Sequence, residues 1–205
     1  MILGAVLSAC GGGGDEDKPL AASRVCDGLF SERVGADSLQ KLTGTSLFVN
    51  TSADDLSKAA KFLEDEHRKR VNWSRTSSTL CVIAGEERRG SFHVQFDVYA
   101  PWDVTDKQHP MDSQLYRLGK KAWAKAGESS LYFECVSPES GASRSRPVRV
   151  HGRVAAHSNR KTPNTREFRE ASLRVLHAAS LKLAKKMECE NSGGLPDPLV
   201  LQPVA

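Results

Sequence analysis

The chain has 205 residues, carries 29 Lys and Arg against 25 Asp and Glu, and is 39% hydrophobic. This composition is typical of a globular chain rather than a disordered one, and the absence of any run of about 18 apolar residues argues against a polytopic membrane protein. The length suits one domain that builds a hydrophobic core of its own.

The N-terminal residues resemble a bacterial lipoprotein signal. Residues 1–7 are apolar, and Leu7-Ser8-Ala9-Cys10 is similar to a lipobox. In such signals the cysteine thiol carries a diacylglycerol and becomes the first residue of the mature protein, so we expect Cys10 to be the lipid anchor. Nothing basic precedes Ile2, and residues 1–9 therefore fit a truncated signal peptide. The glycines and acidic residues of 10–24 predict a flexible tether. The alternative is an apolar N-terminus with an incidental cysteine.

The remaining cysteines indicate disulfide bonds. Cys26, Cys81, Cys135 and Cys189 are even in number and follow one another at separations of 55, 54 and 54 residues. A zinc site would need closely spaced pairs, and free buried thiols in a cytosolic protein are the other alternative. Four cysteines permit three pairings. We expect Cys26 to pair with Cys81 and Cys135 with Cys189, because each bond would then stay within one half of the chain.

Two helices are predicted before the first cysteine-bearing strand. The shorter one runs from Ser31, as its N-cap, to about Leu42, and Gly44 is placed to end it. The longer one covers residues 53–70, with Ser52 and Asp55 in the spacing of a capping box. Its apolar residues fall on one face, and acid-before-base pairs four residues apart indicate that the rest is solvated.

Short apolar and alternating segments predict an antiparallel sheet. In the clearest of them, residues 91–100, apolar and polar side chains alternate, as in a strand buried on one face. Gly152 is a candidate β-bulge. Residues 115–126 fit a helix or a strand equally well. The expected strands are residues 79–84, 91–100, 131–136 and 148–155.

A long helix is predicted to close the domain. It begins near Pro163 or Thr165, with Asn164 and Glu167 in capping-box spacing, and ends near Glu188. The order of elements predicts a single α+β domain over residues 25–190 with a largely antiparallel sheet, N-terminal helices and a long C-terminal helix. Residues 191–205 form a Pro-rich tail.

Motifs of common exported enzymes are absent from the sequence, which lacks G-x-S-x-G, H-E-x-x-H and phosphate-binding glycine loops. Ser38 with Lys41, and Ser158 with Lys161, fit S-x-x-K, but the partner motifs S-D-N and K-T-G are missing. No catalytic residue and no cofactor is therefore assigned.

The first residues to test for catalysis are His93, Asp97 and His151. They fall on predicted alternating strands and could face one another across the sheet, where they would form an acid–base or metal site. The alternative is that these side chains are simply solvated on a polar face.

Basic residues are concentrated near the C-terminus. Between Arg144 and Lys186 the chain has twelve basic residues and two acidic ones, against a net charge of +4 for the whole sequence. Motifs for nucleic-acid recognition are lacking, so anionic polymers or lipid headgroups of the cell envelope are the expected counterparts. A solvated basic helix is the alternative. The candidate anion-binding patch comprises Arg144, Arg146, Arg149, Arg153, Arg166 and Arg169.

Several short motifs together resemble small secreted lipoproteins of high-GC actinobacteria. The resemblance implies a location and paired cysteines, and it carries no reaction or catalytic residue with it. Beside the lipobox and the terminal helix ending at Cys189, the motifs are Cys26-Asp27-Gly28-Leu29, Leu42-Thr43-Gly44-Thr45, Leu80-Cys81-Val82, Tyr116-Arg117-Leu118-Gly119 and Phe133-Glu134-Cys135.

These features predict a lipoprotein at the outer face of the cell membrane, held by lipid on Cys10. Its domain would be a non-catalytic binding or envelope-associated module for an anionic envelope component, with no nucleic-acid partner. The alternative function is an exported hydrolase whose site is assembled from distant residues. A third hypothesis, a cytosolic protein with reduced thiols, follows only if the lipobox is spurious.

Overall fold

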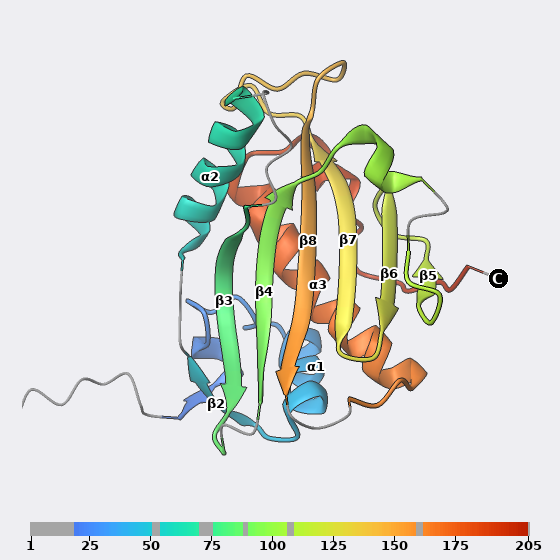
Figure 1. Cartoon of the computed structure of the whole chain (residues 1–205). Coiled ribbons are helices and arrows are strands. Elements are labelled where there is room, and N and C mark those ends of the chain that lie inside the picture. The colour runs from blue at the N-terminus through green and yellow to red at the C-terminus, as the bar shows by residue number, and fades with distance from the viewer. Residues whose placement is uncertain are drawn as a thin grey trace, which may run out of the picture.

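One antiparallel sheet backed by helices forms the protein in a computed structural model (Figure 1). The structure describes residues 19–50, 54–69, 76–87, 90–105, 109–158 and 162–204. Within these residues the sheet has eight strands in the order β1-β2-β3-β4-β8-β7-β6-β5. The predicted α+β domain with an antiparallel sheet and a long C-terminal helix is confirmed.

The strands are β1 (Leu20–Ala21), β2 (Leu47–Asn50), β3 (Ser78–Gly85), β4 (Gly90–Val98), β5 (Gln114–Tyr116), β6 (Lys121–Lys125), β7 (Glu128–Cys135) and β8 (Val148–Ser158). The α-helices are α1 (Arg33–Thr43), α2 (Leu56–Lys69) and α3 (Arg166–Lys186), and the short 3-10 helices are η2 (Ala22–Arg24), η3 (Pro101–Val104) and η4 (Glu190–Gly194).

The two halves of the chain meet at the centre of the sheet. The first half supplies β1 to β4, the second supplies β5 to β8, and β4 pairs with β8 from Gly90↔Ser158 to Val98↔Val150. Because this central pairing joins residues far apart in the sequence, the two halves of the chain form one continuous sheet.

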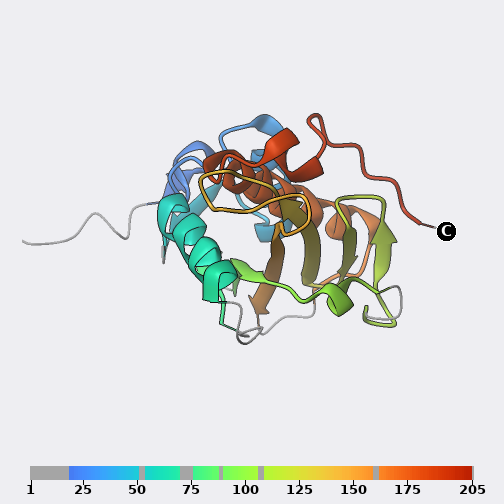
Figure 2. The same ribbon diagram turned by 90° about the horizontal axis from the view of Figure 1, so that it is seen from above.

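The core lies between the sheet and the helices, which share one side of it (Figure 2). Alternation along each strand sends one set of side chains toward this layer, including the fully buried Phe96, Leu131 and Phe133. Leu173 and Leu176 of α3 meet them and are also fully buried. Among the described residues, no α-helix covers the opposite side of the sheet, as Figure 1 shows from the front.

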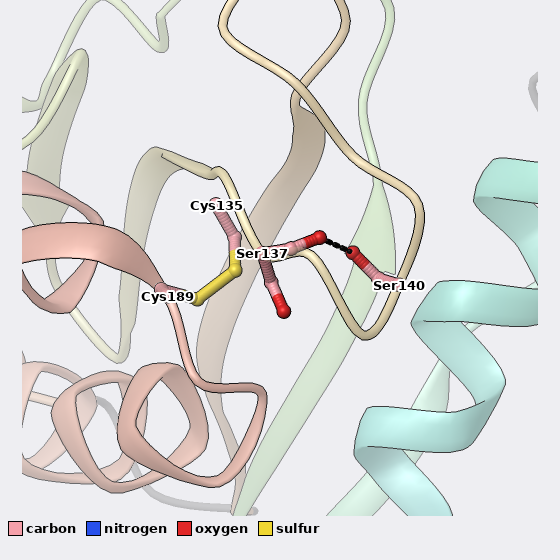
Figure 3. The surroundings of a disulfide bond; sticks show 4 residues. All are labelled: Cys135, Ser137, Ser140 and Cys189. Carbon is pink, nitrogen blue, oxygen red and sulfur yellow. Dashed lines mark hydrogen bonds between the residues drawn. A yellow bond between two sulfur atoms is a disulfide. The ribbon is translucent and has the colours of Figure 1, made fainter.

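Both disulfides tie the helical layer to the sheet. Cys26, which follows η2, bonds to Cys81 of β3 with a Cα–Cα distance of 5.8 Å, and Cys135 at the end of β7 bonds to Cys189 after α3 with a distance of 4.9 Å. These are the two predicted pairings. Beside the second bond, Ser140 Oγ donates to the Ser137 carbonyl at 3.0 Å and closes the turn after β7 (Figure 3).

One predicted helix end is confirmed, and two predicted N-caps are wrong. Gly44 ends α1 in the left-handed conformation with φ 77°, and its N–H donates to Gln40 O, as predicted. The predicted caps Ser31 and Asn164 are wrong by one residue each, because the caps are Glu32 and Thr165. Of these two caps, only the Thr165 side chain accepts a hydrogen bond from its helix, from Phe168 N. Ser52, the predicted cap of the next helix, lies outside the described residues.

The cap of α2 differs from the prediction, because Asp55, expected as the third helical residue of a capping box with Ser52, itself lies before the helix and caps it. Asp55 precedes the helix and its Oδ1 accepts from Lys58 N at 2.8 Å. The helix begins at Leu56 rather than residue 53 and ends at Lys69. An Asp cap at this position satisfies one of the donors that the first turn leaves unpaired.

Gly152 is not a bulge. Its strand pairs without interruption on both sides, with Phe96 in β4 and Leu131 in β7. A Cβ atom at this position would lie 2.7 Å from Phe96 Cε1 and 3.0 Å from Leu176 Cδ1, so the glycine is required by close packing against the core. The irregularity of this part of the sheet lies in β3, between Thr79 and Cys81.

The ambiguous segment 115–126 is extended, and it supplies β5 and β6. The short strands β1 and β2 were not predicted. The C-terminal residues run beside β5: Tyr116 pairs with Pro203, and Val204 N donates to Leu115 O at 2.9 Å. The predicted Pro-rich tail therefore lies against the edge of the sheet in residues 202–204.

Candidate ligand-binding face

The side of the sheet opposite the helices is the candidate functional surface, here called the open face. It is built by alternation, because every second residue of β4, β7 and β8 points away from the core. Register places its members opposite one another, with Asp97 across from His151 and His151 across from Tyr132. The open face comprises Ser91, His93, Gln95, Asp97, Arg149, His151, Arg153, His157, Glu128, Ser130, Tyr132 and Glu134.

Three side chains from three strands form a hydrogen-bonded chain on this face. His151 Nδ1 lies 3.1 Å from Asp97 Oδ1 and 3.3 Å from Asp97 Oδ2, and His151 Nε2 lies 3.2 Å from Ser130 Oγ. Asp97 and His151, predicted to share a site with His93, do lie together. It does not bring His93 to them: His93 contacts His157 instead.

The carboxylate–imidazole–hydroxyl order is that of a catalytic triad. Ser130, however, lies within a regular strand, paired to Arg153 on one side and to Trp123 on the other, and only 1% of it is exposed. Its backbone N–H therefore belongs to a β-ladder and is not free to hold an oxyanion. In this conformation the chain of bonds orders the face and leaves little access to the hydroxyl.

Aromatic rings fix the position of His151. Tyr132 stacks on the imidazole with centroids 4.4 Å apart, and Tyr99 meets Tyr132 edge-on at 5.3 Å. Burial, and secondarily the charge of Asp97, raises the pKa of Tyr132 to about 12. Burial also raises the pKa of Tyr99, with the charge of Glu134 adding to it. Both tyrosines are therefore neutral hydroxyls at physiological pH.

A second cluster lies toward the other end of the central strand pair. The rings of His93 and His157 have centroids 4.0 Å apart, and His93 Nε2 lies 3.1 Å from Ser91 Oγ. Burial, with a smaller contribution from His157, lowers the pKa of His93 below its usual 6.5. The described ranges hold no group of three or more His, Cys, Asp or Glu that could bind a metal.

The six arginines of the candidate anion patch occupy three places. Arg149 and Arg153 are on the open face, Arg144 and Arg146 are in the turn before β8, and Arg166 and Arg169 are in the first turn of α3. The turn and the start of α3 lie toward opposite ends of the sheet (Figure 1). The structure therefore brings Arg149 and Arg153 together but does not gather all six.

Most of these guanidinium groups have acidic neighbours. Arg149 Nε lies 3.6 Å from Glu134 Oε1 and Arg153 Nε lies 2.8 Å from Glu128 Oε1 across the sheet. Away from the face, Arg144 lies 3.3 Å from Glu190 and Arg166 lies 2.7 Å from Glu170. The concentration of positive charge in the sequence is thus divided and partly compensated in space.

The other candidates from the sequence are the lipid-anchor cysteine and the S-x-x-K residues of the first helix. Cys10, the predicted lipid anchor, lies outside the described residues. Ser38 of the S-x-x-K motif donates to Val34 O at 2.6 Å within α1. Ser38 and Lys41 line a charged groove of about 350 Å³ between α1 and α3, on the helical side of the molecule.

No model of a protein family, no curated protein and no solved structure matches the chain. The helices of the described segments include none that is both long and apolar enough to cross a membrane. Two disulfides are typical of proteins from oxidising, extracytoplasmic compartments.

Ser130, Tyr132 and the contact of His157 with His93 were not among the predicted site features. Ser130 lies before the predicted strand 131–136, whereas the observed strand begins at Glu128. A strand three residues longer would have placed Ser130 and Tyr132 on one face by alternation. The register between β7 and β8, which brings them to His151, has no local signal in the sequence.

Proposed function

We propose that the protein is a cell-surface binding module, held to the membrane by lipid on Cys10, that binds an anionic component of the cell envelope on its open face. The observation that carries the proposal is the asymmetry of the sheet. The three α-helices of the described ranges and both disulfides lie on one side, and the other side presents histidine, tyrosine and arginine side chains.

A face built on paired strands suits recognition. Its strands are fixed by central pairing in the sheet, so side chains such as His151 are held in place before a ligand arrives. The rings of Tyr132 and His151 are already stacked, which reduces the conformational entropy that binding would cost.

Arg149 and Arg153 supply the positive charge for an anion. The Arg153 side chain is 44% exposed and its carboxylate partner Glu128 is 22% exposed. An incoming phosphate or carboxylate can therefore reach the guanidinium from solvent and compete with Glu128. Because such contacts are screened by ions, the affinity is expected to fall steeply between low and high salt.

The test compares two charge reversals in the full chain. Arg153→Glu alters the open face, whereas Arg33→Glu alters α1, where the side chain is 94% exposed on the helical side. Binding to isolated cell envelopes and to vesicles of anionic lipid should weaken about tenfold for Arg153→Glu and remain unchanged for Arg33→Glu. Equal losses would mean that net charge alone drives binding, and no binding by the unaltered chain would refute the proposal.

The anchor has an independent test. The intact mass of the protein from its native host, alkylated without reduction, should show cleavage before Cys10, an added diacylglycerol and no alkylated thiol. An unprocessed chain with alkylated cysteines would place it in the cytosol and contradict the proposed location.

The chain from Asp97 through His151 to Ser130 favours one second candidate, an exported serine hydrolase. If this function is correct, a fluorophosphonate should label the chain covalently, and Ser130→Ala should abolish labelling while Ser145→Ala, in an exposed loop, should not. Absence of labelling, in agreement with the 1% exposure of Ser130, would leave the binding module as the better explanation.

A further inference from the structure

His93 and His157 come together through the register of the central strands. His93 in β4 pairs with Ala155, and His157 in β8 pairs with Ser91, so the two histidines are diagonal neighbours on the same side of the sheet. Diagonal neighbours lie within reach of one another when their side chains are aromatic. The rings meet at 4.0 Å between centroids, with their planes tilted by 34°.

The pair brings two nitrogen donors of the same kind to one place. Neutral imidazole is a good ligand for late divalent ions of the first transition series, whereas Mg²⁺ and Ca²⁺ prefer oxygen. His157 is exposed, so its ring can turn toward an ion without disturbing the core. Two ligands on rigid neighbouring strands need little reorganisation to bind together.

Ser91 provides an outer partner for His93. Its Oγ lies 3.1 Å from His93 Nε2, and a hydroxyl there can accept a hydrogen bond from the Nε2–H tautomer. That tautomer leaves the lone pair on Nδ1. Ligating histidines usually donate their second N–H in this way, because the bond fixes both the ring and the tautomer.

The groups that face the histidine pair come from the strands on either side of it. From β3, the residues opposite His93 and Ser91 are Val82 and Ala84, which carry no charge. From β7, Glu128 lies opposite Ala155. Glu128 lies 2.8 Å from Arg153 and 3.5 Å from Lys125, so its single negative charge partly compensates these two basic groups.

From this geometry we infer that His93 and His157 form a binding site for a divalent transition-metal ion of the Zn²⁺ type. Within the described residues the pair is not extended by a third His, Cys, Asp or Glu. Water, or an oxygen atom of a bound molecule, would complete the coordination, which makes this an open site rather than a structural one. The inference is independent of the proposed envelope binding.

The experiment is a calorimetric titration of the full chain with Zn²⁺, with Mg²⁺ as the comparison ion. Cys10 is replaced by serine in every sample, because a free thiol would itself bind zinc. One equivalent of Zn²⁺ should bind, and His93→Gln and His157→Gln should each weaken binding at least tenfold. Ser91→Ala should weaken it about tenfold, and Mg²⁺ should not compete.

His109→Gln is the matched control, because His109 lies in a loop outside the pair and contacts Ser113. NMR provides a second measurement: Zn²⁺ should shift the ring signals of His93 and His157 before those of the other histidines. Unchanged affinity in the exposed-site variant His157→Gln, or shifts spread equally over all histidines, would overturn the inference. Because His157 is exposed, its variant is expected to fold normally, which a thermal melt without metal verifies.

Discussion

His151 Nδ1 lies 3.1 Å from the carboxylate of Asp97, although the two residues are 54 positions apart in the sequence. The contact crosses from β4 to β8, the strands that join the two halves of the chain. One hydrogen bond on the open face thus reports directly on whether the central register has formed.

Asp97→Ala should lower the free energy of unfolding by about 1–2 kcal/mol, because it leaves a partly buried imidazole without its acceptor. Urea denaturation measures the loss. Asp112→Ala, at an exposed loop position, should change the stability by less than about 0.5 kcal/mol. In a double-mutant cycle with His151→Ala, a coupling energy near zero would show that the two side chains do not interact in solution.

Removal of either disulfide should cost nearly the same stability. The bonds close loops of 55 and 54 residues, for which the chain-entropy relation gives about 4 kcal/mol each. We expect Cys26→Ala/Cys81→Ala and Cys135→Ala/Cys189→Ala to unfold at similarly reduced urea concentrations. A loss confined to one pair would mean that packing around that bond, rather than loop closure, determines its contribution.

Gly152→Ala should destabilise the protein by about 1–3 kcal/mol, because the added methyl group would overlap Phe96 and Leu176. Gly35→Ala in α1 is the control, since its nearest neighbour is Phe30 Cα at 3.4 Å and alanine favours a helix. In thermal melts, the melting temperature should fall for Gly152→Ala and rise for Gly35→Ala. If Phe96→Leu restores the stability of Gly152→Ala, the overlap with the Phe96 ring is its cause.

His177 of α3 should make the fold sensitive to acid. The residue is only 5% exposed, and burial lowers its pKa below 6.5, against the opposing effects of the Pro196 carbonyl and of Asp197. The folded state therefore binds fewer protons than the unfolded state, so stability falls as the pH drops from about 6.5 through the pKa of the folded protein.

The ring signals of His177 should accordingly titrate with a midpoint below 6.5, and His177→Leu should flatten the decline of stability between pH 7 and 5. A midpoint above 6.5 would contradict the assignment. His109→Leu is the matched control, because His109 lies in the loop before β5 and outside the core.

Local patterns in the sequence were sufficient to predict the elements with the clearest periodicity or end signals. The alternation of residues 91–100 marked β4, and Gly44 marked the end of α1 by the left-handed conformation it adopts. Cysteine number and spacing suggested both disulfides. By contrast, β1 has two residues and β2 has four, which is too short for a periodic pattern to emerge.

The arrangement of the open face could not be predicted from local information in the sequence. Asp97 and His151 were expected to meet because both lie on alternating strands, but the meeting of His93 with His157 requires knowing that β4 pairs with β8 in one register. A shift of one residue would turn every one of these side chains to the core. Likewise, the arginines of the candidate patch are close in the sequence but far apart in space, because they lie in a turn, a strand and a helix on different surfaces.

If lipid on Cys10 holds the protein at a membrane, as we propose, the residues beside β5 affect how neighbouring copies meet. Residues 202–204 occupy one border of the sheet, and the opposite border ends in the two-residue strand β1. Neighbouring copies held in two dimensions would meet edge to edge at high local density, and long unpaired borders would let their sheets fuse into fibrils. Short and occupied borders let many copies stand side by side and remain separate molecules.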